Sequence, residues 1–368
     1  MKHFCFLTGL YSRYDVLMFE RQGKSLVSAG YKVTYIVCDN KPNEFLDGIE
    51  IIATGFKPKN RFARFLHTRK ILLKSALNVN ADVYQISDPE LILIVGALKK
   101  HGKRVVFNMR EYYPDMIRDK NYIPQFLRRG VSVFYKYMMK TYLKKYDAIF
   151  IVTPWILDVV KKKWGISKSY LLTNFPRVHI DYHLSREDYL LRKDVMCYEG
   201  TVYETSRQEN VFEALENLPS VHYILAGKID DNYSWIKEMP YWKNVEFIDG
   251  FTLKDLEKIF ARSTIANVFR DFGNNDGSWG VIKIFESMEA ALPVLLADVP
   301  MYREMVAKYH CGICVNPNNV EQIRDAIRFL IENKEEAYQM GQNGRRAVIE
   351  EYNWEKQADV YVKILNRL

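Results

Sequence analysis

The sequence has no run of 18 or more apolar residues, so it predicts no membrane-spanning helix. The stretch Met1–Gly9 is too short and turns polar too soon for a signal peptide, and we expect a buried strand there instead. The five cysteines are scattered and odd in number, which is typical of a reducing cytoplasm. Cys311 and Cys314 have redox-motif spacing, but no second pair accompanies them, and their apolar surroundings favour packing over a redox or zinc role.

The length and the charge distribution both indicate two domains. A chain of 368 residues is too long for one ordinary core and suits two domains of about 150–200 residues each. Residues 1–176 carry 30 Lys and Arg against 14 Asp and Glu, a net charge of +16. The remainder carries 23 against 31, a net charge of −8, and the two values sum to +8. A basic half joined to an acidic half predicts different partners for the two domains.

Two basic stretches of the first half, 57–74 and 122–145, mix cations with apolar and aromatic residues at helical spacing. Basic amphipathic helices with aromatic residues bind anionic membrane surfaces. A nucleic-acid surface is the rival interpretation, but no recognised nucleic-acid module is present, so we expect no nucleic-acid partner. A solvated helix face with a core stripe is the third possibility. The membrane interpretation places the protein in the cytoplasm, peripherally associated with the inner face of the membrane.

Apolar runs alternate with helical patterns along the chain, which predicts two α/β domains with doubly wound parallel sheets. The polar stretch 177–194 resembles a linker, so we predict domains at 1–176 and 177–352, with a last helix at about 353–368 crossing back to the first. Ligands bind such sheets at the carboxyl ends of their strands, which places the expected site in a cleft between the domains. The predicted strands are 3–8, 32–38, 49–53, 82–86, 104–108, 148–152, 195–200, 223–227, 245–250, 264–269 and 294–297; the predicted helices are 15–30, 61–78, 90–101, 123–146, 154–164, 209–217, 252–262, 283–291, 319–333 and 335–352.

The most informative stretch is 280–298, in which a loop gives way to a short helix carrying Lys283 and Glu286 one turn apart. A cation near a helix N-terminus favours phosphate, and a carboxylate one turn later could accept bonds from the two hydroxyls of a ribose. These residues therefore indicate a site for a nucleoside diphosphate. The alternative is an ordinary helix–strand unit with a surface ion pair.

Glycines end three apolar runs of the second half and permit close backbone approach to a ligand: Gly200, Gly227 and Gly250. Turn formation alone would also explain each of them. Arg207 precedes a predicted helix and could face the same cleft as Lys283. Phe251 could flank a flat base.

The second half resembles bacterial glycosyltransferase family 4, which has the GT-B fold of two Rossmann-like domains facing a cleft. The first half resembles a subgroup of that family from polysaccharide gene clusters. The resemblance spans nearly the whole chain. The segments that carry it include Gly200-Thr-Val…Arg207, Ile224-Leu-Ala-Gly227, Lys283-Ile-Phe-Glu286-Ser-Met-Glu-Ala-Ala-Leu-Pro293, Met340-Gly-Gln-Asn-Gly344, Ala81-Asp-Val-Tyr84…Asp88-Pro-Glu90-Leu and Gly102-Lys-Arg-Val-Val…Glu111-Tyr-Tyr-Pro114.

The resemblance implies a donor site in the second domain. Glu286 would hold the ribose, Arg207 and Lys283 would neutralise the diphosphate, and N–H groups around Gly9 would approach the phosphates from the first domain. The expected donor is a UDP- or GDP-linked sugar, with no other cofactor. The full set of implied donor-site residues is Gly9, Gly200, Thr201, Arg207, Gly250, Phe251, Ser278, Lys283 and Glu286.

The resemblance also implies an acceptor site in the first domain, with Asp88 and Glu90 binding the acceptor and Arg110 and Glu111 in catalytic positions beside Arg207 and Lys283. The chain departs from the family pattern at three positions. Ser278 replaces a Glu, Thr201 replaces a phosphate-binding Arg, and Arg110 replaces a His of the subgroup. Arg110 adds positive charge but does not act as a base near neutral pH.

The implied reaction is transfer of a sugar, with retention of configuration, to a lipid-linked saccharide in capsule, O-antigen or exopolysaccharide synthesis. Positioning and charge stabilisation suffice for that reaction without a dedicated nucleophile. The fold implies no metal, and the sequence shows no Asp-x-Asp motif at a strand end. Two alternatives stay open, a catalytically silent scaffold or binding protein with the same fold, and a nucleotide-sugar epimerase, whose usual histidine and glutamate pattern is missing here.

Overall fold

The structure, a computed structural model, describes residues 1–58, 64–118, 123–178, 184–270 and 282–368. The chain forms two compact units, each with its own sheet. The N-terminal unit contains Met1–Asn174 together with Trp354–Leu368, and the C-terminal unit is Phe175–Asn353. The sequence placed these boundaries at 176 and 352, within two residues of the observed ones.

The sheet of the N-terminal unit has the order β3-β4-β2-β1-β5-β6-β7-β8 among the described residues. All neighbouring strands are parallel except β3 and β4. The central strands are buried almost throughout, as expected for a parallel sheet covered on both faces. The strands are β1 (His3–Thr8), β2 (Lys32–Val37), β3 (Glu44–Leu46), β4 (Ile49–Ala53), β5 (Val83–Ile86), β6 (Arg104–Met109), β7 (Ala148–Ile151) and β8 (Ser169–Leu171).

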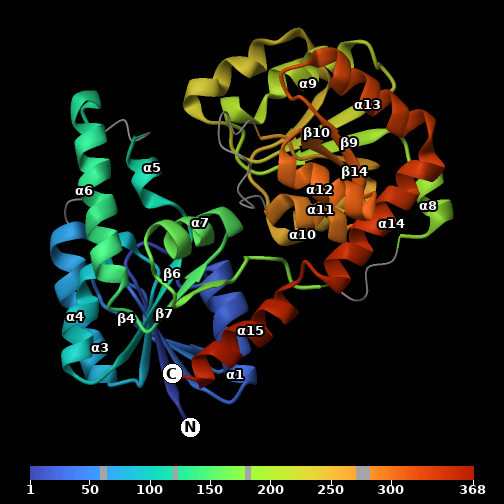
Figure 1. Ribbon diagram of the computed structural model, residues 1–368. Helices are drawn as coiled ribbons and strands as arrows, with labels where there is room; N and C mark the ends of the chain where they lie inside the picture. Colours follow the sequence, from blue (N-terminus) through green and yellow to red (C-terminus); the bar gives the residue numbers. More distant parts are fainter. Residues whose placement is uncertain (59–63, 119–122, 179–183, 271–281) are drawn as a thin grey trace. The chain divides into compact units, whose positions relative to one another are not determined.

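Helices cover both faces of this sheet (Figure 1). One face packs against α3, α4, α6 and α7, and the other packs against η1, α1 and the last helix α15. Trp354, Tyr361 and Leu365 of α15 are fully buried on the second face, so the end of the chain completes the first core. The helical segments are η1 (Val16–Gly23), α1 (Lys24–Ser28), η2 (Arg64–Thr68), α3 (Arg69–Val79), η3 (Pro89–Ile94), α4 (Val95–Lys100), α5 (Tyr113–Arg118), α6 (Gln125–Leu143), α7 (Pro154–Asp158), η4 (Val159–Lys163) and α15 (Trp354–Asn366).

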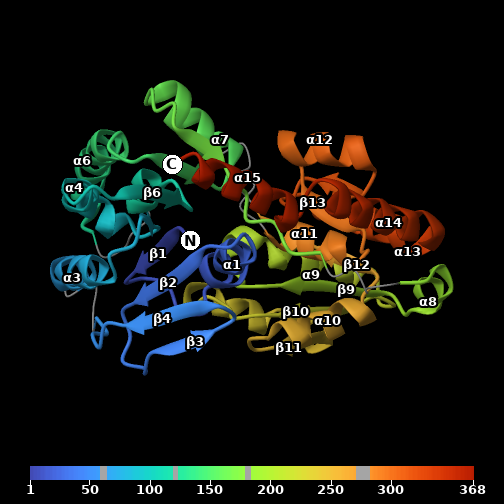
Figure 2. The ribbon, with the colours of Figure 1, turned by 90° about the horizontal axis from the view of Figure 1, so that it is seen from below.

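The sheet of the C-terminal unit is parallel, with the order β11-β10-β9-β12-β13-β14 among the described residues. Helices α9 and α13 lie on one face, and α10, α11 and α12 lie on the other (Figures 1 and 2). The strands are β9 (Val195–Glu199), β10 (His222–Ala226), β11 (Val245–Ile248), β12 (Ile265–Asn267), β13 (Val294–Ala297) and β14 (Gly312–Val315). The helical segments are α8 (Arg186–Leu191), η5 (Glu204–Ser206), α9 (Gln208–Glu216), η6 (Asp231–Glu238), η7 (Pro240–Asn244), α10 (Leu253–Arg262), α11 (Ile282–Glu289), α12 (Pro300–Tyr309), α13 (Val320–Glu332) and α14 (Lys334–Glu350).

The prediction that 177–194 is a linker is wrong in part, because α8 occupies Arg186–Leu191. Ser185 caps this helix by accepting a hydrogen bond from the N–H of Asp188, and Tyr189 anchors it in the core. One buried residue within a polar segment gave no helical period, which is why the sequence did not reveal it. The redox-spaced Cys311 is fully buried in the core beside α11, where burial raises its pKa to about 12, in agreement with a packing role.

No helix in the described part of the chain is both long and apolar enough to cross a membrane.

Candidate functional site

The candidate site lies in the C-terminal unit, where β9 and β10 end. Gly200 follows β9 with a φ of +104°, and Gly227 follows β10 with a φ of +136°. A Cβ atom on Gly227 would lie 2.1 Å from the carbonyl oxygen of Gly200, so the two backbones touch. Only glycine combines this conformation with such a close approach. These glycines therefore fix the path of the chain at the carboxyl edge of the sheet.

Lys283 of α11 lies directly against Gly200. A Cβ atom on Gly200 would lie 2.3 Å from the Lys283 Nζ, so the glycine leaves room for the ammonium group. That group donates a hydrogen bond of 3.1 Å to the Tyr198 hydroxyl and lies 4.4 Å from the centre of the Tyr198 ring. Within the described residues, Lys283 forms no ion pair with a carboxylate. The ammonium group is therefore held in place by the Tyr198 hydroxyl and ring rather than by an ion pair with a described carboxylate.

A pocket of about 190 Å³ opens beside Lys283. Its polar groups are two cations, from Lys283 and Arg270, and a set of hydroxyls, a composition that suits an anion carrying several oxygens. The sequence analysis missed Arg270, although it follows β12 at the same sheet edge, a position that the strand-end rule could have flagged. The lining residues are Tyr198, Thr201, Tyr203, Thr205, Ser206, Phe269, Arg270, Ile282 and Lys283.

Glu199, the last residue of β9, is a second residue that the sequence analysis missed. Its side chain is buried, and Glu286 and Lys283 of α11 act on its charge. Burial and the negative charge of Glu286 raise the pKa of the Glu199 carboxyl to about 8, while Lys283 opposes that shift. Glu286, predicted to hold a ribose, is half-buried one turn after Lys283. The structure thus brings Lys283 and Glu286 together as predicted and adds a second carboxyl group.

Arg207 and Thr201 lie in the segment that leads from β9 to α9. Arg207 has a left-handed φ of +49°, directly precedes α9, and forms an ion pair with Glu209 at 3.5 Å. Thr201 is exposed and lines the pocket, and its carbonyl accepts a hydrogen bond from the Tyr198 hydroxyl. Of these two predicted donor residues, the structure places Thr201 at the pocket and leaves Arg207 outside the lining.

Gly250 and Phe251 lie after β11, two strands away from β9 in the order of the sheet. Gly250 has a φ of +76° with open space around it, and Phe251 packs partly buried against the core beside α10 and α11. Neither residue lines the pocket. Ser278, the remaining predicted donor residue, lies outside the described residues.

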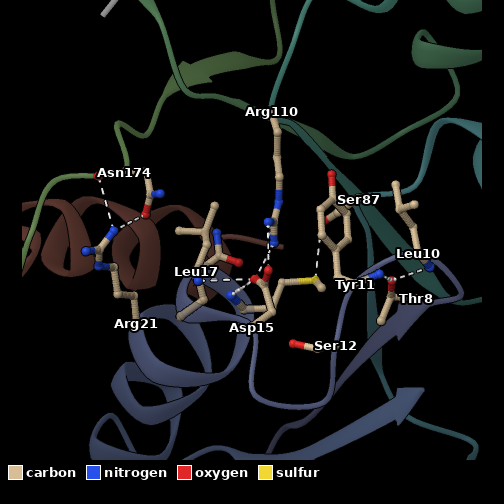
Figure 3. Close-up of polar contacts among 12 residues, drawn as sticks. Thr8, Leu10, Tyr11, Ser12, Asp15, Leu17, Arg21, Ser87, Arg110 and Asn174 are labelled. Carbon is tan, nitrogen blue, oxygen red and sulfur yellow. Dashed lines mark hydrogen bonds and ion pairs between the residues drawn. The ribbon is translucent and has the colours of Figure 1, made fainter. Parts of the chain in front are cut away.

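In the N-terminal unit, the loop around Gly9 is tied to Asp88. The Thr8 hydroxyl and the Gly9 N–H donate to the two oxygens of Asp88, at 2.8 and 2.6 Å. The N–H groups of Leu10 and Tyr11 donate to the Thr8 hydroxyl (Figure 3). The Gly9 N–H therefore has a partner within the unit, and the approach of N–H groups of this loop to a phosphate stays a prediction.

The Asp88 side chain joins the ends of β1 and β5. The side chain is 1% exposed, and both oxygens accept internal hydrogen bonds. Burial raises the pKa of Asp88 to about 7, although the bonds from Gly9 and Thr8 act in the opposite direction. Both oxygens of this carboxylate thus have a partner at the neighbouring strand end, and its acceptor-binding role stays a prediction.

Arg110, at the end of β6, is held between Asp15 and Tyr11 (Figure 3). Its guanidinium donates two hydrogen bonds to Asp15, of 3.0 and 2.6 Å, and lies 3.8 Å from the centre of the Tyr11 ring. Asp15 also caps η1 by accepting from the N–H groups of Leu17 and Met18. Burial alone would lower the pKa of Arg110, but the Asp15 carboxylate raises it above its usual value. Arg110 therefore stays charged and links β6 to η1.

The two glutamates of the predicted acceptor site differ in their surroundings. Glu90 forms an ion pair with Arg64, whose Nε donates a hydrogen bond of 3.0 Å to it. Glu111 is exposed. The structure therefore leaves Glu111 accessible at the end of β6 and engages Glu90 within the unit.

Both halves of the chain match glycosyltransferase families. Residues 19–173 match the model described as Glycosyltransferase Family 4, and residues 185–347 match the model described as Glycosyl transferases group 1. An uncharacterized glycosyltransferase of Methanocaldococcus jannaschii is 24% identical over 180 residues, which are 47% of this chain and 45% of that protein. The match thus spans less than half the length of that relative.

Solved structures of similar fold cover the whole chain. Sucrose-phosphate synthase from Thermosynechococcus elongatus aligns over 100% of this chain and 99% of its own, with a TM-score of 0.76 at 15% identity. Anabaena HepE in complex with UDP-glucose aligns over 100% of both chains, with a TM-score of 0.71 at 13% identity. The chain belongs to the family 4 glycosyltransferases, and its two parallel-sheet units confirm the predicted GT-B fold.

Proposed function

We propose that the C-terminal unit binds a UDP- or GDP-linked sugar and that the protein transfers this sugar to a lipid-linked saccharide. The observation that carries the proposal is the Lys283 ammonium, which lies against Gly200 beside a pocket rich in hydroxyls. A charged hydrogen-bond donor at a pocket is a feature that suits a diphosphate. UDP-glucose is bound in the HepE structure of the same fold, which supports a nucleotide-sugar donor.

In this proposal Lys283 and Arg270 contact the diphosphate, and Glu286 accepts hydrogen bonds from the ribose hydroxyls. The two cations stabilise the negative charge that develops on the leaving diphosphate. No group of the protein forms a covalent intermediate, and the sugar is transferred with retention of configuration. Arg207 lies next to α9 and would assist if its guanidinium turned from Glu209 to the phosphates.

We also propose that the N-terminal unit binds an anionic membrane surface, where a lipid-linked acceptor of capsule, O-antigen or exopolysaccharide synthesis would be found. Helix α6 buries only Ser132, Met139 and Leu143. Its upper part in Figure 1 extends past the sheet of this unit. Large apolar side chains on it are exposed among cations, and that combination favours an anionic interface. The exposed apolar residues are Phe126, Leu127, Val131, Val133, Phe134 and Tyr137, and the cations are Arg128, Arg129, Lys136 and Lys140.

A silent scaffold is the second candidate, and the pairing of Arg110 with Asp15 favours it. The guanidinium stands where the family subgroup carries a His, and it cannot accept a proton near neutral pH. A scaffold would bind the nucleotide without transferring sugar.

The test is the thermal stability of the full chain in UDP, GDP and ADP at matched concentrations, for the wild type and for Glu286→Ala. A ligand at a hundred times its Kd stabilises the folded state by about 2.7 kcal/mol. We expect a shift with one uridine or guanosine nucleotide in the wild type and a much smaller shift in the variant. A folded wild type that responds to none of the three would contradict the donor site.

A further inference from the structure

Glu199 lies on the side of β9 that faces α11. Side chains alternate between the two faces of a strand, so Val195, Cys197 and Glu199 share one face. Val195 and Cys197 pack in the same cluster as Ile284 and Met288 of α11. Glu199 is the next residue on this face of β9. Glu286 of α11 raises the pKa of its carboxyl, and Lys283 of α11 lowers it.

The Glu199 carboxyl is buried without full compensation. The side chain is 6% exposed, and among the described residues its Oε1 atom has no hydrogen-bond partner. A buried ionised carboxylate normally requires a paired cation and several hydrogen-bond donors. Among the described residues, the charged groups that act on it are Glu286 and Lys283 of α11, and the buried thiol of Cys197 lies on its own strand. The one cation in this set directs its hydrogen bond to Tyr198.

We propose that Glu199 is a positioning residue of the donor site, which keeps a proton so that Glu286 alone is ionised when a nucleoside diphosphate binds. This inference rests on the proposed function. Two carboxylates close together do not readily ionise together, and the more buried one keeps the proton. Glu199 is buried whereas Glu286 is half-buried, so the proton belongs on Glu199.

The position of the proton decides the charge that a diphosphate meets. With Glu199 neutral, the charges of Lys283 and Glu286 offset each other, and Glu286 carries the negative charge that accepts hydrogen bonds from ribose. With Glu199 ionised, the site that holds Lys283 and Arg270 gains one further negative charge, which weakens its attraction for the diphosphate. The raised pKa of Glu199, about 8, places this change just above neutral pH. Nucleotide affinity should therefore fall in that range.

The experiment is titration calorimetry of the full chain with UDP and with GDP between pH 7.5 and 9, where the charge of the diphosphate itself is nearly constant. For the nucleotide that binds, the wild-type Kd should rise about eightfold across this range, as loss of one required proton dictates. Glu199→Gln, which keeps the shape of the neutral acid, should show a nearly constant Kd. Glu257→Gln, an exposed substitution on α10, is the matched control and should follow the wild type.

Parallel pH profiles in the wild type and in Glu199→Gln would overturn the inference while leaving the donor site intact. If Glu199→Gln does not fold, a measurement on the wild type alone tests the role of Glu199. Its binding enthalpy at pH 8, measured in buffers of different ionisation enthalpy, should reveal uptake of about half a proton per nucleotide. No uptake would overturn the role of Glu199. Failure of both nucleotides to bind the folded wild type at any pH would overturn the proposed function and this inference together.

Discussion

At the scale of single residues, the proposed donor site depends on the ammonium group of Lys283. Lys283 is fixed by Tyr198 and Gly200 and carries a charge that no carboxylate of the described chain neutralises through an ion pair. A hydrogen bond to a charged group contributes about 1.5–3 kcal/mol. Lys283→Gln should therefore weaken nucleotide binding by about tenfold to hundredfold, as measured by calorimetry. Lys308→Gln removes an exposed lysine of the same unit and should bind like the wild type.

Equal affinities of Lys283→Gln and the wild type would contradict the assignment of Lys283 to the diphosphate.

The buried Glu199 also makes a prediction about stability. Its pKa is about 8 in the folded protein against 4.5 for the free side chain, so between these values the folded chain holds a proton that the unfolded chain has released. Stability from this group is therefore complete below pH 4.5 and is lost as the pH rises toward 8. Relative to Glu199→Gln, the wild type should lose about 1 kcal/mol of unfolding free energy per pH unit in this window. Urea unfolding at pH 5, 6.5 and 8 measures this difference, and a difference independent of pH would contradict the raised pKa.

At the scale of elements, the ends of β9 and β10 should tolerate no side chain. In Gly227→Ala the new methyl group would meet the Gly200 carbonyl, and the positive φ adds strain of about 1–3 kcal/mol. Gly250→Ala has a positive φ but open space, so it isolates the strain from the clash. We expect Gly227→Ala to lower the free energy of unfolding clearly more than Gly250→Ala in urea titrations. Equal losses would mean that the two strand ends do not touch as described.

Helix α6 is the element through which we expect the N-terminal unit to bind the membrane. The double variant Phe126→Ser with Phe134→Ser removes two rings that are 84% and 68% exposed, and full burial of each would contribute about 1.5–3 kcal/mol. Sedimentation with vesicles that contain phosphatidylserine should show binding at least about tenfold weaker than that of the wild type. Phe45→Ser, which removes a ring that is 75% exposed on β3, is the control and should leave binding unchanged. Equal losses in both variants would argue against α6 as the contact surface.

The sequence predicted those elements whose apolar pattern is long or strictly bounded. Strands β1, β4 and β13 have the predicted limits, because a glycine, a proline or a polar residue lies directly outside each end. It missed β3 and β8, edge strands of three residues each, and the helices α5, α8 and α12, each of which has at most two buried residues. Patterns of one or two residues carry no period, so such elements depend on contacts with distant parts of the chain.

The residues of the candidate site also fall into those that the sequence revealed and those that it did not. Lys283 and Glu286 were found because they share one helix, so that their spacing alone sets their relation. Glu199 and Arg270 were missed because their relation to Lys283 arises from strands that pair only in the folded unit. The sequence also could not show that Thr8 and Gly9 donate hydrogen bonds to both oxygens of Asp88.

At the scale of the whole molecule, the two halves differ in charge, +16 up to residue 176 and −8 beyond it. Association of the basic half with an anionic surface should weaken as salt screens its charges. The proposed reaction relies on Lys283 and Arg270 for the leaving diphosphate, so we expect sugar transfer to persist in EDTA. Loss of transfer in EDTA, with recovery when a divalent cation is added, would contradict that mechanism.

The most direct test of the central claim is acceptor-dependent release of UDP or GDP from a panel of nucleotide sugars, with and without a bacterial lipid extract that contains lipid-linked saccharides. We predict release by the wild type with one donor, dependent on the extract and accompanied by transfer of the sugar to a lipid product. Lys283→Gln should lose this release, and Lys308→Gln should retain it. Nucleotide binding without release under any of these conditions would contradict the account and favour the scaffold.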